Sequence, residues 1–205
     1  MPKKAFPWHQ IVLATKNKGK IKEFSRMFDP FDVEVLTIAD LPDLPDVVED
    51  GDTFEANARK KAEVISKITD LPALADDSGL EVEALGGEPG VYSARFAGPD
   101  ATDAENNAKL VARMQGVPEA ARQARFVSVL ALAIPGEETM FARGTCEGRL
   151  VLEASGSNGF GYDPHFYVPE KERTMAELSP EEKNRISHRG VAVHVLEGML
   201  MERFS

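Results

Sequence analysis

Cysteine is nearly absent from this sequence, whose 205 residues include only Cys146. One thiol cannot form a disulfide within the chain, and it is too few for a thiolate metal cluster of the zinc-finger kind. A metal ion would therefore have to be held by carboxylates.

Long apolar runs are missing as well. The longest, Phe126–Ile134, has nine residues and includes Ser128, whereas a helix that spans a bilayer needs about 20. Near the N-terminus, Lys3 and Lys4 precede an apolar segment of only five residues, Ile11–Thr15, which is too short for the core of a signal peptide. We therefore expect a soluble, cytoplasmic protein with no membrane partner.

The sequence also lacks an excess of basic residues, because 24 Lys and Arg face 34 Asp and Glu and give a net charge of −10. Proteins that wrap a nucleic-acid duplex need a basic face to displace counterions, so we expect no nucleic-acid partner. The charges are uneven: residues 1–26 hold seven bases and one acid (+6), and residues 27–58 hold ten acids and no base (−10). Two solvated faces would explain this pattern, and so would a polyanionic ligand bound with a divalent cation.

The length fits a single domain over residues 1–205, because domains commonly have about 150 residues. The 42% of hydrophobic residues can supply its core. Strand-like apolar runs alternate with segments of helical period, which predicts an α/β fold with a mixed sheet. The expected strands cover residues 11–14, 33–38, 74–75, 80–84 and 91–96, with antiparallel hairpins between 124 and 152. The expected helices cover residues 19–28, 53–68 and about 102–116.

Capping sequences mark three helix starts. Asp52 followed by Glu55 is a variant of the capping box, and Thr102 with Glu105 repeats this signal. Ser179, Pro180 and Glu182 place a cap, a first-turn proline and a capping-box acid in order. A C-terminal helix is therefore expected to begin there or soon after.

The loop Thr15–Lys20, T-K-N-K-G-K, joins the first expected strand to the first expected helix. Free backbone N–H groups and the helix dipole favour an anion at such a helix start, so this loop is a candidate phosphate site. It is not a Walker loop, because the pattern G-x-x-x-x-G-K-[ST] does not occur in the chain. An ordinary turn with solvated lysines is the alternative.

Asp76 and Asp77 follow an expected buried strand, at a position where open α/β sheets commonly place metal ligands. Carboxylate oxygens suit Mg²⁺, which usually takes one or two protein carboxylates together with substrate phosphates. Glu49, from the acidic segment, is a candidate for a further ligand. A plain turn with an exposed pair of acids is the alternative.

Two later segments are further candidates, the first of them for binding a flat ligand. Residues 158–164, N-G-F-G-Y-D-P, have two glycines that permit close backbone approach and two aromatic rings for stacking. Residues 183–189, K-N-R-I-S-H-R, hold four basic residues. A hairpin loop with its aromatics in the core and a solvated basic helix face are the alternatives.

Six motifs in order resemble one family, the non-canonical purine nucleoside triphosphate pyrophosphatases, also called inosine or xanthosine triphosphate pyrophosphatases. They are T-x-N-x-x-K (15–20), T-F-E-x-N-A-x-x-K-A (53–62), A-D-D-S-G-L (75–80), G-G-x-P-G-V-Y-S-A-R (86–95), G-F-G-Y-D-P (159–164) and E-K-N-x-x-S-H-R-G (182–190). Each motif alone is weak, but six with compatible spacing are very specific. The resemblance covers about residues 11–200, and residues 1–10 form an N-terminal extension.

The resemblance implies an elongated mixed sheet with flanking helices, two lobes around a nucleotide cleft, and usually a homodimer. It also implies Mg²⁺-dependent hydrolysis of inosine, deoxyinosine and xanthosine triphosphates to the monophosphate and pyrophosphate, which removes them from the nucleotide pool. By motif position, Asp77 matches the general base, and Glu49 and Asp77 match the metal ligands. The matching substrate contacts are Thr15, Asn17, Lys20, Lys61, Ser78, Phe160, Gly161, Tyr162, Asp163, Lys183, His188 and Arg189.

Lys183, His188 and Arg189 cannot line one pocket from a single straight helix. At 100° per residue, the second and third of these side chains point about 140° and 240° away from the first. We therefore predict a short helix over about 180–185, a break, and a second helix capped by Ser187.

The 6-oxygen of hypoxanthine and xanthine distinguishes these bases from adenine, which carries an amino group there. Donors from Arg189 and from the backbone N–H groups of Phe160–Asp163 would pair with the oxygen and be left unpaired against adenine. What would exclude guanine cannot be assigned in this way, because guanine also has the 6-oxygen.

Two other functions remain open. A pyrophosphatase for pyrimidine or methylated nucleotides would share the phosphate and metal residues but not the segment 183–189. A nucleotide- or RNA-binding module without catalysis would use the basic N-terminal segment together with Phe160 and Tyr162, and it would need no carboxylates.

Overall fold

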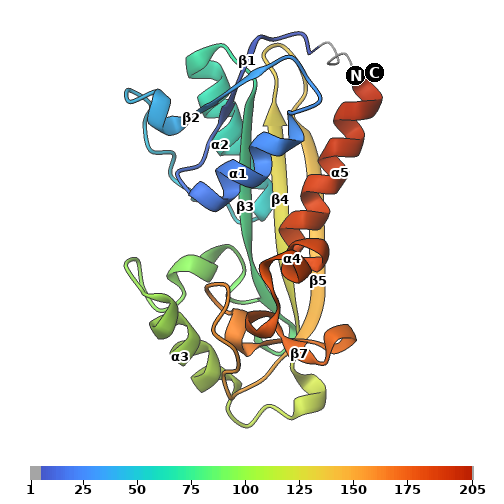
Figure 1. The fold of residues 1–205 in the computed structure, drawn as a ribbon. Helices are drawn as coiled ribbons and strands as arrows, with labels where there is room; N and C mark the ends of the chain where they lie inside the picture. Colours follow the sequence, from blue (N-terminus) through green and yellow to red (C-terminus); the bar gives the residue numbers. More distant parts are fainter. Residues whose placement is uncertain (1–5, 205) are drawn as a thin grey trace. The chain divides into compact units, whose positions relative to one another are not determined.

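The structure, a computed structural model, describes residues 6–204 (Figure 1). Its sheet has seven strands in the order β2-β1-β3-β4-β5-β6-β7. The strands are β1 (Gln10–Leu13), β2 (Glu34–Thr37), β3 (Ala73–Val82), β4 (Gln123–Ala133), β5 (Met140–Leu150), β6 (Phe166–Val168) and β7 (Arg173–Thr174). The α-helices are α1 (Lys18–Met27), α2 (Phe54–Thr69), α3 (Asp103–Met114), α4 (Pro180–Ile186) and α5 (His188–Arg203).

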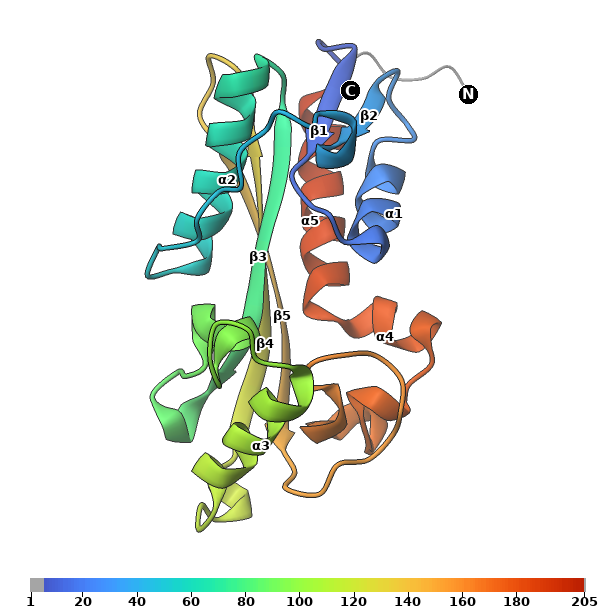
Figure 2. The ribbon, with the colours of Figure 1, turned by 90° about the vertical axis from the view of Figure 1, so that its left-hand side faces the viewer.

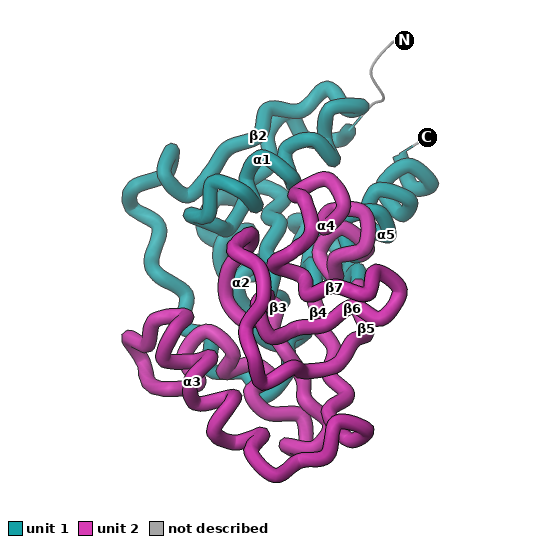
Figure 3. The backbone as a smooth tube through the Cα atoms, turned by 60° about the horizontal axis from the view of Figure 1, so that its bottom comes forward, with its two compact units in different colours: residues 1–77, 129–143, 192–205 teal, residues 78–128, 144–191 magenta. Residues whose placement is uncertain are grey.

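Backbone contacts divide the chain into two compact units, which Figure 3 shows in different colours. Unit 1 comprises Met1–Asp77, Val129–Arg143 and Ala192–Ser205, and unit 2 comprises Ser78–Ser128 and Gly144–Val191. Neither unit is a continuous stretch of chain. Part of the predicted N-terminal extension, residues 1–5, lies outside the described residues.

Unit 1 holds the parallel part of the sheet. β1 pairs in parallel with β2 and β3, and Leu13 is in register with Thr37 on one side and Leu74 on the other. Figure 2 shows α2 on one face of these strands and α1 and α5 on the other. Helix α2 packs through Ala58 and Ala62, which are fully buried and one helical turn apart.

Unit 2 holds the antiparallel pairs β5–β6 and β6–β7. Its core includes Leu80, Leu110, Phe126 and Phe166, which come from β3, α3, β4 and β6. Capping boxes begin both α3 and α4, as predicted from Thr102 and Ser179.

The predicted mixed α/β organisation is confirmed, and three local expectations are wrong. Residues 91–96 do not form a strand, because Gly90–Arg95 is a 3-10 helix in which the Ser93 hydroxyl donates to the carbonyl of Gly90 at 2.6 Å. The strand expected over 80–84 is the end of the longer β3, which stops at Val82. The cap of α2 is Thr53, one residue after the predicted Asp52.

The helices of residues 6–204 include none that is long and apolar enough to cross a membrane.

Candidate functional site

The loop after β1 is held by its own side chains. The Asn17 side chain caps α1 by accepting a hydrogen bond from the Lys20 backbone N–H at 3.1 Å, and the Thr15 hydroxyl accepts one from the Asn17 N–H at 3.2 Å. The predicted strand, loop and helix are therefore present. Three of the predicted site residues lie together at the N-terminus of α1, the positive end of its dipole.

Lys20 forms an ion pair with Asp76, with 2.6 Å between Nζ and Oδ2. The register of β1 on β3 explains this contact, because Leu13 is the last residue of β1 and is paired with Leu74. Asp76 therefore lies level with the residues just beyond the carboxyl end of β1. The prediction that Asp76 and Asp77 follow the end of their own strand is wrong, because β3 continues to Val82. The Asp76 side chain is only 2% exposed, so the lysine neutralises a carboxylate that is almost entirely removed from water.

Lys61, on α2, connects the acidic segment to β3. Its Nζ lies 2.8 Å from Oε1 of Glu49, and it also donates to the backbone carbonyl of Asp76. The lysine side chain is 15% exposed and that of Glu49 is 33% exposed. Both predicted phosphate lysines therefore have carboxylate partners within unit 1.

These groups surround a hollow of about 270 Å³ in unit 1. Its charged lining residues are three lysines and three acids, namely Lys16, Lys20, Lys61, Asp46, Glu49 and Asp76. The opposite charges are equal in number, so the side chains that line the hollow have no net formal charge. An anionic ligand that replaces the acids as partners of the lysines would leave carboxylates available to a cation.

Asp77 has a different partner from its neighbour, because successive side chains of a strand point to opposite faces. Its Oδ2 accepts a hydrogen bond from Nδ2 of Asn57 at 2.9 Å, and both side chains are buried. Ser78 follows in β3 and is the first residue of unit 2.

The candidate metal ligands of residues 6–204 are few. Within the described residues, no group of three or more His, Cys, Asp or Glu side chains is arranged to hold a metal ion. Glu49 and Asp77, the two predicted ligands, would supply only carboxylate oxygens, a donor set that fits Mg²⁺ bound together with phosphate oxygens.

The predicted base-binding loop of unit 2 is closed by Asp163. Its Oδ2 accepts a hydrogen bond from the Phe160 N–H at 3.0 Å and forms an ion pair with Nζ of Lys183. Gly159 has a φ of +78°, and a Cβ there would collide with the Asp163 carboxylate. A glycine at this position therefore allows the loop to fold tightly around the carboxylate.

Phe160 is the exposed aromatic residue of this loop, with 58% of its surface exposed. The Lys183 ammonium lies 4.5 Å from the ring centroid and the Arg189 guanidinium lies 5.9 Å from it. The structure thus brings together three predicted contacts in unit 2, an aromatic face and two cations that carry hydrogen-bond donors.

Tyr162 and His188 are buried, unlike Phe160. The Tyr162 hydroxyl donates to the backbone carbonyl of Ser93 at 2.7 Å, and burial raises the pKa of this phenol. The His188 ring stacks on Phe126 with 4.9 Å between ring centroids. Both side chains therefore pack in unit 2.

The predicted break between two C-terminal helices is confirmed. Helix α4 ends at Ile186, Ser187 has extended backbone angles, and α5 starts at His188. The Ser187 hydroxyl accepts a hydrogen bond from the Gly190 N–H at 3.1 Å, as a helix cap does. Lys183 and Arg189 consequently reach the same Phe160 ring from two helices.

Three polar residues that support the site were not singled out from the sequence. Asn57 contacts Asp77, and Asp103 and Asn107 of α3 bind the Gly161 backbone N–H and carbonyl at 2.7 and 2.8 Å. Asp103 and Asn107 are four residues apart, so they share a helix face. The sequence signals that could have identified these residues were the spacing of Asp103 and Asn107 and the presence of a polar residue, Asn57, on the apolar stripe of α2.

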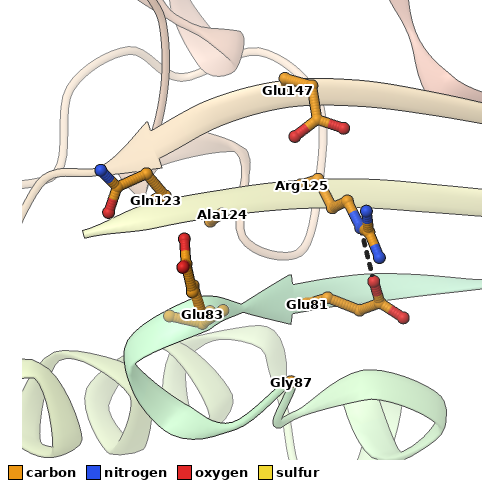
Figure 4. A pocket seen from close by; sticks show the side chains of 8 residues that line it. Glu81, Glu83, Gly87, Gln123, Ala124, Arg125 and Glu147 are labelled. Atoms are coloured by element: carbon orange, nitrogen blue, oxygen red, sulfur yellow. Dashed lines mark hydrogen bonds and ion pairs between the residues drawn. The ribbon is translucent and has the colours of Figure 1, made fainter. Parts of the chain in front are cut away.

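A second hollow lies on the sheet of unit 2, and its volume is about 250 Å³ (Figure 4). It is lined by Glu83, Glu147 and an ion pair in which Arg125 donates to Glu81 at 2.6 Å. None of its described lining residues is a predicted site residue.

Fold and site together define an α/β protein with a lysine- and carboxylate-lined hollow and an exposed aromatic loop flanked by cations. The chain belongs to the Ham1 family, whose model matches residues 11–198. This confirms the family relationship predicted from the six motifs.

Individual relatives match nearly the whole chain. The dITP/XTP pyrophosphatase of Geobacillus kaustophilus (strain HTA426) is 54% identical over 188 residues, which are 92% of each chain. The dITP/XTP pyrophosphatase of Shouchella clausii (strain KSM-K16) is 50% identical over 189 residues, which are 92% of this chain and 95% of the relative.

Solved structures of similar proteins share this fold. The Staphylococcus aureus Ham1 protein superposes with a TM-score of 0.89 at 45% identity, covering 95% of this chain and 99% of that one. A nucleoside-triphosphatase / dITP/XTP pyrophosphatase from Mycobacterium abscessus gives a TM-score of 0.82 at 43% identity, with 93% and 99% covered.

Proposed function

We propose that this protein hydrolyses deoxyinosine, inosine and xanthosine triphosphates to the nucleoside monophosphate and pyrophosphate. The observation that carries the proposal is the set of Lys20, Lys61, Glu49 and Asp76 around one hollow of unit 1. Relatives with about half of their residues identical, which are named dITP/XTP pyrophosphatases, support the choice of reaction.

Lys20 and Lys61 bind the triphosphate in this proposal, together with Thr15 and Asn17 of the loop before α1. A nucleoside triphosphate carries about four negative charges, which fixed cations have to offset before a nucleophile can approach phosphorus. The lysines can exchange a carboxylate for a phosphate oxygen without being left unpaired. The amide-rich start of α1 adds the favourable end of the helix dipole.

Glu49 and Asp77 would hold Mg²⁺ through carboxylate oxygens, with substrate phosphates completing its coordination. The ion would supply positive charge at the phosphates and lower the pKa of a bound water.

Asp77 acts as the general base. Its carboxylate accepts the proton of the attacking water as the water adds to the α-phosphorus, and the bond from that phosphorus to the bridging oxygen breaks. Lys20 and Lys61 stay with the departing pyrophosphate. Ser78, next to Asp77 in β3, provides a further substrate contact.

The purine base is bound by unit 2. Phe160 offers an exposed ring for stacking, and Lys183 and Arg189 offer donors for the 6-oxygen. The loop's backbone contributes less than the sequence suggested, because the N–H groups of Phe160 and Gly161 already donate to Asp163 and Asp103. Gly161, Tyr162, Asp163 and His188 then shape the loop and the wall behind the ring.

The remaining expectations belong to the same proposal. In this proposal the phosphates of the nucleotide bind to residues of unit 1 and its base to residues of unit 2, and the two lobes around a nucleotide cleft stay a prediction from the motifs. We further propose a single domain, because neither unit is continuous in sequence, and a homodimer in the cytoplasm, where the nucleotide pool lies.

A substrate panel with pyrophosphate detection tests the function. With Mg²⁺ present, we expect kcat/KM for deoxyinosine and xanthosine triphosphates to exceed that for ATP and GTP by at least about 100-fold, a modest demand on a site that hydrogen-bonds the 6-oxygen. Comparable ATP hydrolysis would overturn the donor assignment. Guanine differs from hypoxanthine only by its 2-amino group, so comparable GTP hydrolysis would overturn only the exclusion of that group by the pocket wall near C2. Faster thymidine triphosphate turnover would favour the pyrimidine-directed enzyme, and absence of any pyrophosphate release would favour a binding module.

A further inference from the structure

Asn57 lies inside unit 1 with none of its surface exposed, and its side-chain amide joins two parts of the site. Its Oδ1 accepts a hydrogen bond from the Gly51 backbone N–H at 2.8 Å, and its Nδ2 donates to Oδ2 of Asp77 at 2.9 Å.

The chemistry of the partners fixes which way this amide points. A backbone N–H can only donate, so the amide oxygen has to face Gly51. The amide NH₂ group consequently faces Asp77, whose Oδ2 accepts its hydrogen bond. A flipped amide would place two donors together on one side and two acceptors together on the other.

The neighbourhood of Gly51 is built around this contact. A Cβ on Gly51 would lie 2.8 Å from Oδ1 of Asn57 and 2.9 Å from Cβ of Ala56. A side chain at position 51 would therefore push the backbone away from the amide.

Asn57 and Lys61 are one turn apart on α2 and make parallel connections. Asn57 joins Gly51 to the Asp77 side chain, and Lys61 joins Glu49 to the carbonyl of Asp76. This face of α2 thus holds both ends of the acidic segment 49–51 against the two aspartates of β3.

We infer that Asn57 is a positioning residue, an inference that rests on the proposed function. Asn57 orients the Asp77 carboxylate and sets the distance from Asp77 to the segment that carries Glu49. With Oδ2 engaged by the amide, the carboxylate cannot rotate freely about its Cβ–Cγ bond. The oxygen that receives the proton of the water is then defined, and Asn57 itself does not touch the substrate.

A double-mutant cycle on wild type, Asn57→Leu, Asp77→Asn and the double variant tests this role. We expect Asn57→Leu to lower kcat with deoxyinosine triphosphate by about 10- to 100-fold. The KM should change by less than about threefold. In the Asp77→Asn background, Asn57→Leu should change kcat by less than about threefold, because Asn57 acts through Asp77 and the effects of the two substitutions on kcat are then not additive. Full additivity of the two losses would overturn the inference.

Asn106 provides a matched control in unit 2. It is also a buried helical asparagine, and its amide bridges the Ala97 N–H and the Ala94 carbonyl at 2.8 and 3.1 Å. Asn106→Leu should lower the urea midpoint but leave kcat per folded molecule unchanged. An equal loss of kcat in this variant would show that the effect of Asn57→Leu is general destabilisation, and the inference would fail.

Two further measurements separate this inference from the proposed function. Gly51→Ala disturbs the contact from its other side, so it should lower kcat in the same direction even where Asn57→Leu folds poorly. Urea midpoints of a second cycle, in which Asp77→Ala removes the acceptor and replaces Asp77→Asn, report coupling between positions 57 and 77 without any substrate. Failure of the wild type to release pyrophosphate would overturn the proposed function alone. Additive shifts of the urea midpoint would overturn the inference that Asn57 positions Asp77.

Discussion

Lys20 and Asp76, 56 positions apart in the sequence, form an ion pair in which the carboxylate is 2% exposed and the lysine side chain is 21% exposed. The lysine therefore has two tasks in this chain. It stabilises a buried carboxylate in the free protein, and it is a proposed ligand of the triphosphate.

Substitutions can separate these two tasks. Lys20→Met should cost about 3–5 kcal/mol of unfolding free energy, because it removes the ion-pair partner of a buried carboxylate. Adding Asp76→Asn should restore much of that stability. Nucleotide binding should remain weaker by about 1.5–3 kcal/mol in both variants. Urea unfolding and titration calorimetry with a non-hydrolysable triphosphate measure the two quantities, and recovery of binding in the double variant would contradict the proposed phosphate role.

Asp77→Asn should keep the fold and lose kcat by roughly 10²- to 10⁴-fold, the usual range for a positioned base. The substitution keeps the size of the side chain, and its amide oxygen can still accept from Asn57. Pyrophosphate release at saturating substrate measures the loss, with circular dichroism as the control for folding. Turnover at the wild-type rate would remove Asp77 from the role of base.

Phe160→Ala should weaken substrate binding by about 1–3 kcal/mol, the contribution of a base stacked on an aromatic ring. The loss should appear mainly in KM, because the ring is proposed to contact the base and not the phosphates. Phe160→Tyr, which keeps the ring, is the matched control and should stay close to wild type. Equal KM values for the alanine variant and the wild type would contradict stacking at this loop.

The Cys146 thiol is buried, and burial raises its pKa from 9.0 to about 11. The folded state thus favours the neutral thiol, so the associated stability is present below pH 9 and is lost as the pH rises from there towards 11. At pH 8 we expect slow labelling by dithionitrobenzoate in the native protein and rapid labelling in urea. Fast stoichiometric labelling of the native protein, absent in Cys146→Ala, would show that the thiol is accessible.

Much of the fold was predictable where local signals agree with tertiary packing. The apolar stripe of α2 and the incompatible angles of Lys183 and Arg189 on one helix each led to the observed element. The predicted strand over 91–96 failed because the Ser93 hydroxyl binds the carbonyl three residues earlier and supports a 3-10 helix. Composition gives no sign of such a bond.

The site residues also differ in how far the sequence predicts them. Lys20 and Asp76 could be predicted as candidates because lysines beside a helix start and acids after a strand have recognised chemistry. Asn57, although it is part of the motif over 53–62, received no role, because its importance lies in two partners that the fold brings to it, Gly51 and Asp77. Buried Tyr162 shows the converse, since an aromatic residue beside a glycine looks like Phe160 until its packing is known.

The break at Ser187 has a consequence for how this protein can vary. Along a continuous helix, one inserted residue rotates every later side chain by about 100°. Because α4 and α5 are separate helices, a change of length or sequence in α4 can move Lys183 while Arg189 keeps its direction. The two cations beside Phe160 can therefore be altered independently, which makes α4 a segment where the proposed recognition of the base can be redesigned without rebuilding the C-terminal helix.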